Sequence, residues 1–180
     1  RCAQILIPVA QVLHEVHRSG MIHRDLKPGN IFIETTGGRE TVKVVDFGIA
    51  KLMGEAPGDA PMTVAGSVIG TPSYMAPERF GDESIDGKSD VYALGVTLFQ
   101  MLEGHKPFVA ETQNIIAIAM QHLGKAPPPL ELSVPHVTPE LEELLVASLA
   151  KEPAQRPTAE EFAQRLAVAV GLAKRASDPR

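Results

Sequence analysis

Apolar side chains recur at three- and four-residue spacing from the start of the chain. In residues 3–19 the apolar positions are Leu6, Val9, Ala10, Leu13 and Val16. This period predicts an amphipathic helix, and Gly20 follows where such a helix would end. Pro8 lies inside the segment, so either the regular part of the helix begins near Pro8 or the helix is kinked there.

Beyond this helix the pattern changes from helical to strand-like. Residues 31–33 and 42–45 are two short β-rich runs separated by the turn-forming residues 36–39, and they predict a small hairpin. Residues 46–78 contain much Gly, Pro, Ser and Thr and show little periodicity. A connection longer than roughly 12–15 residues is usually either functional or disordered.

The second half of the chain is predicted to be helical. Residues 89–103 are apolar nearly all round and are followed by a glycine, which predicts a central helix buried on most sides. A further helix is expected near residues 111–121. A proline-rich connector over residues 126–135 then leads to a helix opened by Thr138 and Pro139.

The last predicted helix begins at Thr158, where Thr158 and Glu161 match the reciprocal capping-box pattern. The apolar stripe behind this cap consists of Phe162, Leu166 and Val170. We therefore expect a mainly α fold, a helical bundle with one short β-hairpin, in a single folding unit that spans residues 1–172. Residues 173–180 look like the start of a polar linker.

Composition narrows the classes of partner. The 180 residues carry a formal net charge of -5 with a pI near 5.7, which argues against a nucleic-acid partner.

Cys2 is the only cysteine, so no internal disulfide or thiol-ligated metal is expected, and a cytoplasmic location fits. The longest apolar stretch, residues 93–102, is far shorter than the ~20 residues of a membrane-spanning helix. The chain begins with neither methionine nor a signal-peptide pattern, and we expect it to be cut from a longer protein.

Three polar side chains in one loop form the strongest chemical signal. Residues 23–30 read HRDLKPGN and place Asp25, Lys27 and Asn30 close together. Phosphoryl transfer needs such a set, because its transition state spreads negative charge that metals and cations must stabilise. Asp25 would orient the attacking hydroxyl and accept its proton, and Lys27 would place positive charge on the γ-phosphate. Asn30 would offer a neutral oxygen ligand to Mg²⁺.

A further acidic group follows the predicted hairpin. Asp46 begins the tripeptide Asp46-Phe47-Gly48 and would supply the anionic ligand that bridges metal and phosphates. The hairpin would return Asp46 to the side of Asn30. Together these residues form a candidate site for ATP with Mg²⁺, or with Mn²⁺.

These motifs resemble, in order and separation, the catalytic loop and metal-binding tripeptide of the eukaryotic-type (Hanks-type) serine/threonine protein kinases. Four further strings resemble later motifs of that family: GTPSY at residues 70–74, APE at 76–78, SDVYALG at 89–95 and KEPAQRP at 151–157. The resemblance covers essentially the whole chain, and the motif spelling looks more like bacterial members than animal ones. It implies the C-terminal lobe of a kinase that transfers the γ-phosphate of ATP to Ser and Thr hydroxyls of protein substrates.

The resemblance also implies residues that support the site. Asp90 would hold the backbone around His23 and Arg24, since a buried carboxylate at the start of an apolar helix needs hydrogen bonds. Glu78 and Arg156 would pair and tie the activation segment to the late helices.

Other supporting residues surround the same loop. Thr71 would hydrogen-bond near the catalytic aspartate and lysine. His23 would pack under the tripeptide that contains Phe47 and Gly48 rather than carry a proton, because Asp25 already serves as the base.

Arg24 is, by the same resemblance, the mark of kinases that are switched by phosphorylation in the activation segment. Thr63 and Ser67 are the candidate acceptors. A phosphate adds roughly -1.5 to -2 charge and would pair with Arg24, which orders the loop. The alternative for each hydroxyl is an inert, solvated side chain.

The histidines offer one alternative kind of site. His14 and His17 lie one helical turn apart and could ligate a metal, but no third ligand completes the set. His105, His122 and His136 show no pattern.

The sequence lacks the motifs of a kinase N-terminal lobe, and this leaves three hypotheses about what the chain is. A complete kinase domain has a Gly-rich loop, a strand lysine and a helix glutamate before the catalytic loop, and this sequence has none of them. The chain is then a piece of an active kinase without its N-terminal lobe, a stand-alone lobe that docks partners through residues 111–121, or a small-molecule kinase of the same fold. The intact catalytic residues favour the first hypothesis, and the string at residues 70–78 argues against the third. Without the N-terminal lobe, weak ATP binding and an exposed apolar face are expected.

Overall fold

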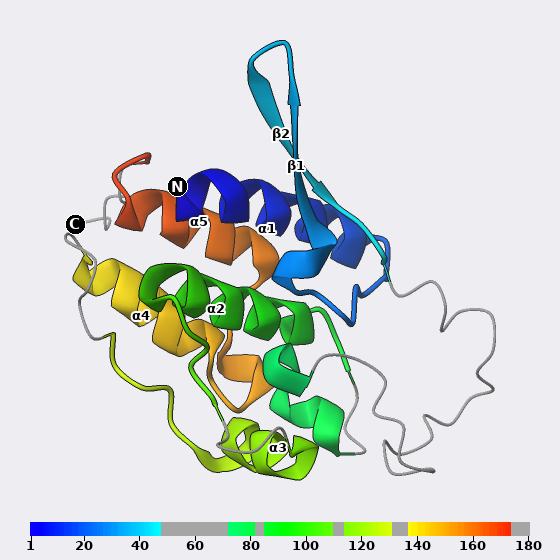
Figure 1. The fold of residues 1–180 in the computed structure, drawn as a ribbon, viewed down its shortest axis with the longest axis vertical. Helices are drawn as coiled ribbons and strands as arrows, with labels where there is room; N and C mark the ends of the chain where they lie inside the picture. The colour runs from blue at the N-terminus through cyan, green and yellow to red at the C-terminus, as the bar shows by residue number, and fades with distance from the viewer. Residues whose placement is uncertain (48–71, 82–84, 110–113, 131–136, 174–180) are drawn as a thin grey trace, which may run out of the picture.

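The computed structural model describes residues 1–47, 72–81, 85–109, 114–130 and 137–173. Within these ranges it contains five α-helices, short 3₁₀ turns and one two-stranded antiparallel sheet. Figure 1 shows the strands as a hairpin that projects from a helical body. The expectation of a mainly helical fold with one β-hairpin is confirmed. The predicted linker from residue 174 onward lies outside the described residues.

The first helix, α1, spans Cys2–Arg18 and contains Pro8 in its interior. The alternative in which the regular helix begins near Pro8 is therefore wrong. Burial explains the earlier start, because Ala3 and Leu6 on the turns before Pro8 already contribute to the core. The helix ends just before Gly20, whose φ of 79° lies in the left-handed region that glycine adopts without strain.

The hairpin consists of β1, Ile31–Thr36, and β2, Arg39–Val44, paired in antiparallel register from Ile31 opposite Val44 to Thr36 opposite Arg39. The strands extend further toward the turn than predicted, because only Gly37 and Gly38 form it, whereas β2 ends at Val44, one residue before the predicted end. Their φ values of 58° and 78° are those of a two-residue turn that matches the strand twist. The hairpin thus returns the chain directly to its starting loop.

Helix α2, Lys88–Glu103, is the central element of the core, as predicted. Residues 89–99 are all buried, and the helix contacts α1, α4 and α5. It ends at Gly104 with a φ of 78°. A Cβ on Gly95 would come within 2.9 Å of the Ser148 side chain, so this glycine lets α2 approach α4 closely.

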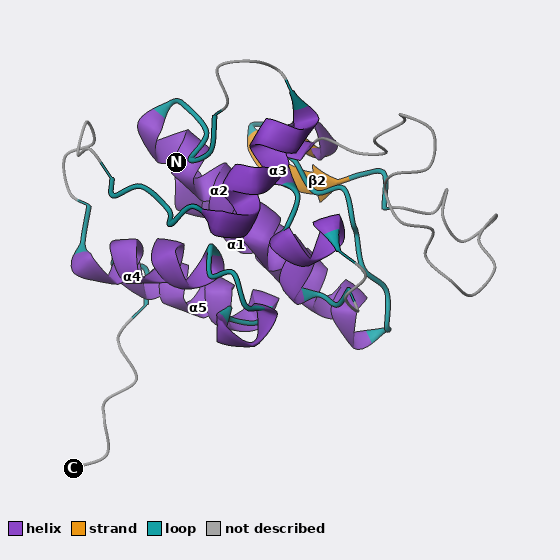
Figure 2. Cartoon of the chain, turned by 90° about the horizontal axis from the view of Figure 1, so that it is seen from below, coloured by secondary structure: helices purple, strands orange, loops and turns teal. Residues whose placement is uncertain are grey.

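The remaining helices surround this core. Helix α3, Ile115–Gly124, begins later than predicted because the Asn114 side chain caps it by accepting from the Ile116 N–H at 2.9 Å. Helix α4, Pro139–Ser148, is capped by Thr138, as expected. Helix α5, Ala159–Ala169, contacts both α1 and α4, and Figures 1 and 2 show these three helices running close together.

The predicted capping box of α5 is present. Thr158 accepts from the Glu161 N–H at 3.2 Å, and the Glu161 carboxylate accepts from the Thr158 N–H at 2.7 Å. Phe162 and Leu166 are buried as expected, whereas Val170 is 43% exposed. The prediction for Val170 is wrong because the helix ends at Ala169, which takes its place in the core.

Among the helices in the described ranges, each is too short or too polar to cross a bilayer.

Candidate active site

The loop that follows α1 brings together three of the predicted catalytic side chains. The Lys27 Nζ lies 2.6 Å from Asp25 Oδ2, and the Asn30 Nδ2 donates to the Asp25 carbonyl oxygen at 2.8 Å. A short 3₁₀ turn, Pro28–Asn30, closes the loop and buries Asn30. The side chains of Asp25 and Lys27 remain about one-third exposed, at 36% and 29%. A substrate group can therefore reach both charges from solvent.

Asp46 lies where the hairpin returns to this loop. The Val45 N–H donates to the Asn30 carbonyl at 3.0 Å, which continues the strand pairing by one bond and places Asp46 directly after it. Asp46 has a φ of 57°, a left-handed conformation that is uncommon for residues other than glycine. Such backbone outliers persist only where the surroundings enforce them, and they concentrate at functional sites.

His23 packs beneath the tripeptide that Asp46 begins. Its Nε2 lies 3.0 Å from the Val45 carbonyl oxygen, and its ring centroid lies 4.8 Å from that of Phe47. His23 is fully buried. The side chain therefore joins the two halves of the site, the loop after α1 and the end of the hairpin.

The Asp90 carboxylate holds the backbone of the loop that contains Asp25. It accepts from the His23 N–H at 2.8 Å and from the Arg24 N–H at 2.9 Å, as expected from the sequence. Asp90 is 1% exposed, and these bonds compensate for the burial of its charge.

His17 is a residue of this site that sequence reasoning missed. Its Nε2 lies 2.8 Å from Asp90 Oδ2, so α1 contributes a third partner to the buried carboxylate. The spacing of His14 and His17 had suggested only a metal pair. Among the described residues no cluster of three metal-ligating side chains forms, and His14 instead lies 3.7 Å from Glu160. The contact between His17 and Asp90 depends on how α1 packs on α2, which no local pattern reveals.

Glu78 and Arg156 form a buried, two-pronged ion pair. The Arg156 Nη1 donates to Glu78 Oε1 and the Arg156 Nη2 donates to Glu78 Oε2, each at 2.7 Å. Ser89 also donates to Glu78, and Arg156 donates further to the carbonyls of Ala150 and Lys151. Burial would raise the pKa of Glu78, but hydrogen bonds from Arg156 and Ser89 and the charge of Arg156 outweigh it and lower that pKa below its ordinary value. The pair fastens the segment of residues 72–81 to the loop before α5.

A second buried polar cluster was also missed. The Tyr92 hydroxyl lies 2.9 Å from His122 Nδ1, and Lys151 Nζ donates to the His122 carbonyl at 2.7 Å. Burial, together with the charges of Lys151 and Lys106, lowers the pKa of His122 to about 4, so this histidine is neutral at physiological pH. Burial likewise lowers the pKa of Lys151 to about 8. The cluster joins α3 to α2.

Several predicted residues lie outside the described part of the chain. They are Gly48, Thr63, Ser67, Gly70 and Thr71.

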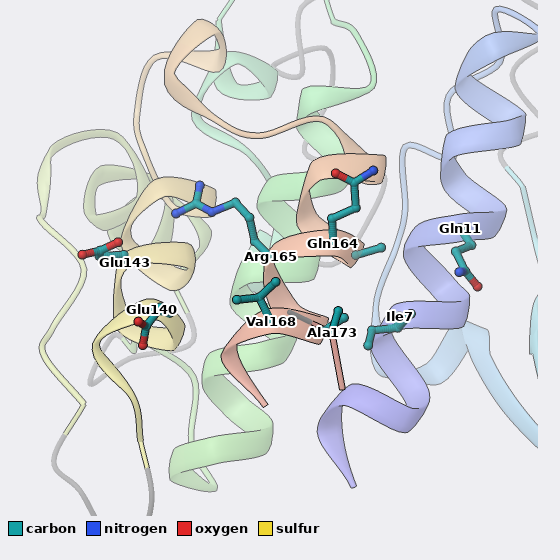
Figure 3. Close-up of a pocket in the computed structure, with 10 residues that line it drawn as sticks. Ile7, Gln11, Glu140, Glu143, Gln164, Arg165, Val168 and Ala173 are labelled. Atoms are coloured by element: carbon teal, nitrogen blue, oxygen red, sulfur yellow. The ribbon is translucent and has the colours of Figure 1, made fainter. Parts of the chain in front are cut away.

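A pocket of about 560 Å³ lies away from the loop that contains Asp25, among α1, α4 and α5. Figure 3 shows Ile7, Val168 and Ala173 around it, with Glu143 on α4 and Arg165 on α5. None of the predicted catalytic residues lines this pocket.

A family model described as the protein kinase domain matches residues 1–166. The chain belongs to the protein kinase family. The resemblance inferred from the motifs is thereby confirmed, and the loop with Asp25, Lys27 and Asn30 is the part of this kinase domain that we regard as its candidate active site.

Curated relatives agree with this assignment. The chain is 39% identical to serine/threonine-protein kinase pkn3 of Myxococcus xanthus over 99% of its length, which covers 33% of that protein. It is 42% identical to Pkn1 of the same organism over 94% of its length, covering 24% of Pkn1. It is 37% identical to PknJ of Mycobacterium tuberculosis over 94% of its length, covering 28% of PknJ. The chain thus spans about a quarter to a third of the bacterial serine/threonine kinases that it matches.

Proposed function

We propose that this domain acts in a serine/threonine protein kinase that transfers the γ-phosphate of ATP to Ser and Thr hydroxyls of protein substrates. The observation that carries the proposal is the convergence of Asp25, Lys27 and Asn30 in one loop, to which the hairpin returns Asp46. Membership in the kinase family and the names of the relatives support the same chemistry.

In this proposal each side chain of the loop has a separate task. Asp25 accepts the proton of the attacking hydroxyl, and its partly exposed side chain lies within reach of a docked substrate. Lys27 carries its charge 2.6 Å from that carboxylate, where it also neutralises a phosphoryl group as it passes to the hydroxyl. The fixed loop keeps both groups in place before the substrate arrives, so little reorganisation is needed during the reaction.

The donor atoms fit a hard divalent cation such as Mg²⁺, or Mn²⁺ in its place. Asn30 donates through Nδ2 to the Asp25 carbonyl, which fixes the amide and turns its oxygen Oδ1 to the other side. Asp46 supplies a carboxylate, and both are the oxygen ligands that Mg²⁺ prefers. Mg²⁺ usually keeps several waters and takes further ligands from substrate phosphates, so one or two protein ligands are enough to hold it. When bound with ATP, the ion would shield the negative charge of the phosphates.

We further propose that residues 1–172 form the C-terminal lobe and that an N-terminal lobe completes the nucleotide site. Large apolar side chains on the hairpin support this view, because Phe32 is 55% exposed and Ile33 is 40% exposed next to the buried Asn30. Apolar groups in such a position are commonly covered by a partner. The partners of the domain would then be this lobe and protein substrates. A reducing cytoplasm is the proposed location, since the unpaired Cys2 needs no oxidising compartment.

A second candidate function rests on the surface of α3. Ile116, Met120 and Leu123 follow each other at helical spacing and are 72%, 63% and 44% exposed. This stripe favours a docking role for the lobe, which would persist without catalysis.

Transfer of labelled γ-phosphate tests the proposal. The full-length gene product, supplied with γ-labelled ATP, Mg²⁺ and casein, is expected to label protein at phosphoserine and phosphothreonine, and chelation of the metal should stop the labelling. Labelling confined to phosphotyrosine or to small alcohols would contradict the proposal. Absence of all transfer from a folded protein would favour the docking role.

A further inference from the structure

The backbone immediately before Asp25 is held in a strained turn. Arg24 has a φ of 68°, and the Asp25 N–H donates to the His23 carbonyl at 2.9 Å. A hydrogen bond from a residue to the second residue before it, around a positive φ, defines the rare and strained form of the γ-turn. Because the turn directly precedes Asp25, its geometry sets the direction in which the Asp25 side chain leaves the backbone.

Two side chains hold this turn from opposite ends of Arg24. On the N–H side, Asp90 of α2 accepts from the Arg24 N–H at 2.9 Å. On the carbonyl side, the Arg79 Nη1 donates to the Arg24 carbonyl oxygen. Arg79 belongs to the 3₁₀ turn Pro77–Phe80, which comes from a different part of the chain than α2. The strained residue is thus fixed at both of its backbone polar groups.

The surroundings of Arg79 keep its guanidinium at this position. Burial lowers the pKa of Arg79, while the nearby carboxylates of Asp25 and Asp90 act in the opposite direction and favour its charged form. Where residues 72–81 pack against the Asp25 loop and the start of α2, the space around Arg24, Asp25, Arg79 and Asp90 is only about 10 Å³. Such a void holds at most about one water molecule, so the two segments are closely packed.

Two neighbouring residues of this 3₁₀ turn, Glu78 and Arg79, bind different parts of the chain. Glu78 is anchored to Arg156, at the loop before α5, through two bonds of 2.7 Å. Arg79, the next residue, reaches the turn at Arg24 instead. Residues 72–81 therefore cannot leave their place on the helical body without also releasing the turn before Asp25.

We propose that Arg79 is a positioning residue that fixes the γ-turn at Arg24 and so couples the placement of residues 72–81 to the orientation of Asp25. The catalytic consequence of this inference rests on the proposed function. The hydrogen bond by which Arg79 holds the turn, called the clamp below, is a structural claim. Docking of residues 72–81 on the body orients the base, and their release lets the turn relax.

Amide hydrogen exchange of residues 22–26 in the full-length protein tests the clamp without any need for activity. Arg79→Met removes the donor but keeps most of the side-chain volume, and it is expected to speed exchange in this loop by roughly tenfold, as loss of a charged hydrogen bond implies. Arg79→Lys retains charge and a donor and is expected to stay within about threefold of wild type. Arg165→Met on α5 serves as the matched control and should leave the loop unchanged. Unaltered loop exchange in folded Arg79→Met would overturn the inference.

Steady-state kinetics test the catalytic consequence. Arg79→Met is expected to lower kcat by roughly tenfold or more while the KM for ATP changes by less than about twofold, and Arg79→Lys should restore most of kcat. Equal losses in the Lys and Met variants would contradict the proposal. If Arg79→Met does not fold, Arg79→Lys decides: wild-type loop protection supports the clamp, and lost protection in a folded protein refutes it. A wild-type protein that transfers no phosphate would refute the proposed function, while the exchange data would still decide the clamp.

Discussion

Asp90 shows how one buried charge organises the candidate site. Its carboxylate is 1% exposed and is surrounded by the backbone N–H groups of His23 and Arg24 and by the His17 ring, all within 2.8 to 2.9 Å. A buried charge without such partners would be strongly unfavourable. Because Asp90 belongs to the most buried helix, it transmits the rigidity of the core to the loop that carries Asp25.

The ion pair of Glu78 and Arg156 leads to a prediction about stability. Arg156→Met leaves the Glu78 carboxylate buried without its main partner and should lower the free energy of unfolding by about 3–5 kcal/mol. Urea denaturation at neutral pH measures the loss. Adding Glu78→Gln to Arg156→Met should restore part of the stability, because the unpaired charge is then gone. A single variant as stable as wild type would contradict the account.

The same pair predicts a pH dependence. The pKa of Glu78 is lower in the folded state than its ordinary value of 4.5, so its contribution is fully present above that value. The contribution is lost as the pH falls through the folded-state pKa, because the unfolded chain then binds more protons. Urea midpoints taken from neutral pH to well below 4.5 should therefore fall more steeply in wild type than in Glu78→Gln. Parallel curves would show that Glu78 is not the group responsible.

At the scale of elements, the packing of α2 against α4 depends on a close approach at Gly95. Gly95 of α2 faces Ser148 and Leu149 at the end of α4, and an added Cβ would lie 2.9 Å and 3.1 Å from their side chains. The Ser148 Cβ cannot move away without shifting its helix. Glycine is thus required at this crossing despite its low helix propensity.

Gly95→Ala is expected to destabilise the domain by about 1–3 kcal/mol through overpacking, even after the gain of up to about 1 kcal/mol in helix propensity. Thermal or urea denaturation measures the change. Gly124→Ala at the end of α3 is the matched control, because its added Cβ meets nothing within 4 Å. Equal stability of the two variants would refute the close-approach argument.

The segment that contains Thr63 and Ser67 carries a prediction about regulation. If phosphate on either residue pairs with Arg24, the double change Thr63→Ala and Ser67→Ala should lower phosphotransfer by roughly tenfold, the value of a charge-assisted hydrogen bond. The KM for ATP should stay the same. Activity and protease resistance of the loop are the measurements. Unchanged values for both would show that neither hydroxyl acts as a switch.

Local sequence patterns predicted the elements better than the contacts between them. The capping residues Thr138 and Thr158 and the glycine after α2 marked helix ends correctly, because these signals act within one turn. The start of α3 was misplaced, since the Asn114 cap was not recognised. The loop with Asp25, Lys27 and Asn30 could be predicted because these residues lie within six positions of one another in the sequence. Local patterns could not predict the contacts of His17, Arg79 and His122. The partners of these residues lie far along the chain and meet them only through tertiary packing.

At the scale of the whole molecule, the helical body serves as a support for one loop and one hairpin. Helix α2 holds the loop through Asp90, and the hairpin returns Asp46 beside it. Residues 72–81 are bound to Arg156 through Glu78 and to the loop through Arg79. Figure 1 shows the hairpin projecting from this body, and its exposed apolar residues Phe32 and Ile33 are available to a further lobe. Catalysis by this arrangement would depend on the charges of the loop rather than on the body itself.

The most direct test of that claim is the single-turnover rate of phosphate transfer in Asp25→Asn, measured in the full-length protein with saturating ATP and Mg²⁺. Glu142→Gln on the exposed face of α4 is the matched control. We expect a loss of about 10²–10⁴-fold for Asp25→Asn, with an unchanged unfolding midpoint and a wild-type rate in the control. A near wild-type rate in folded Asp25→Asn would show that Asp25 is not the catalytic base.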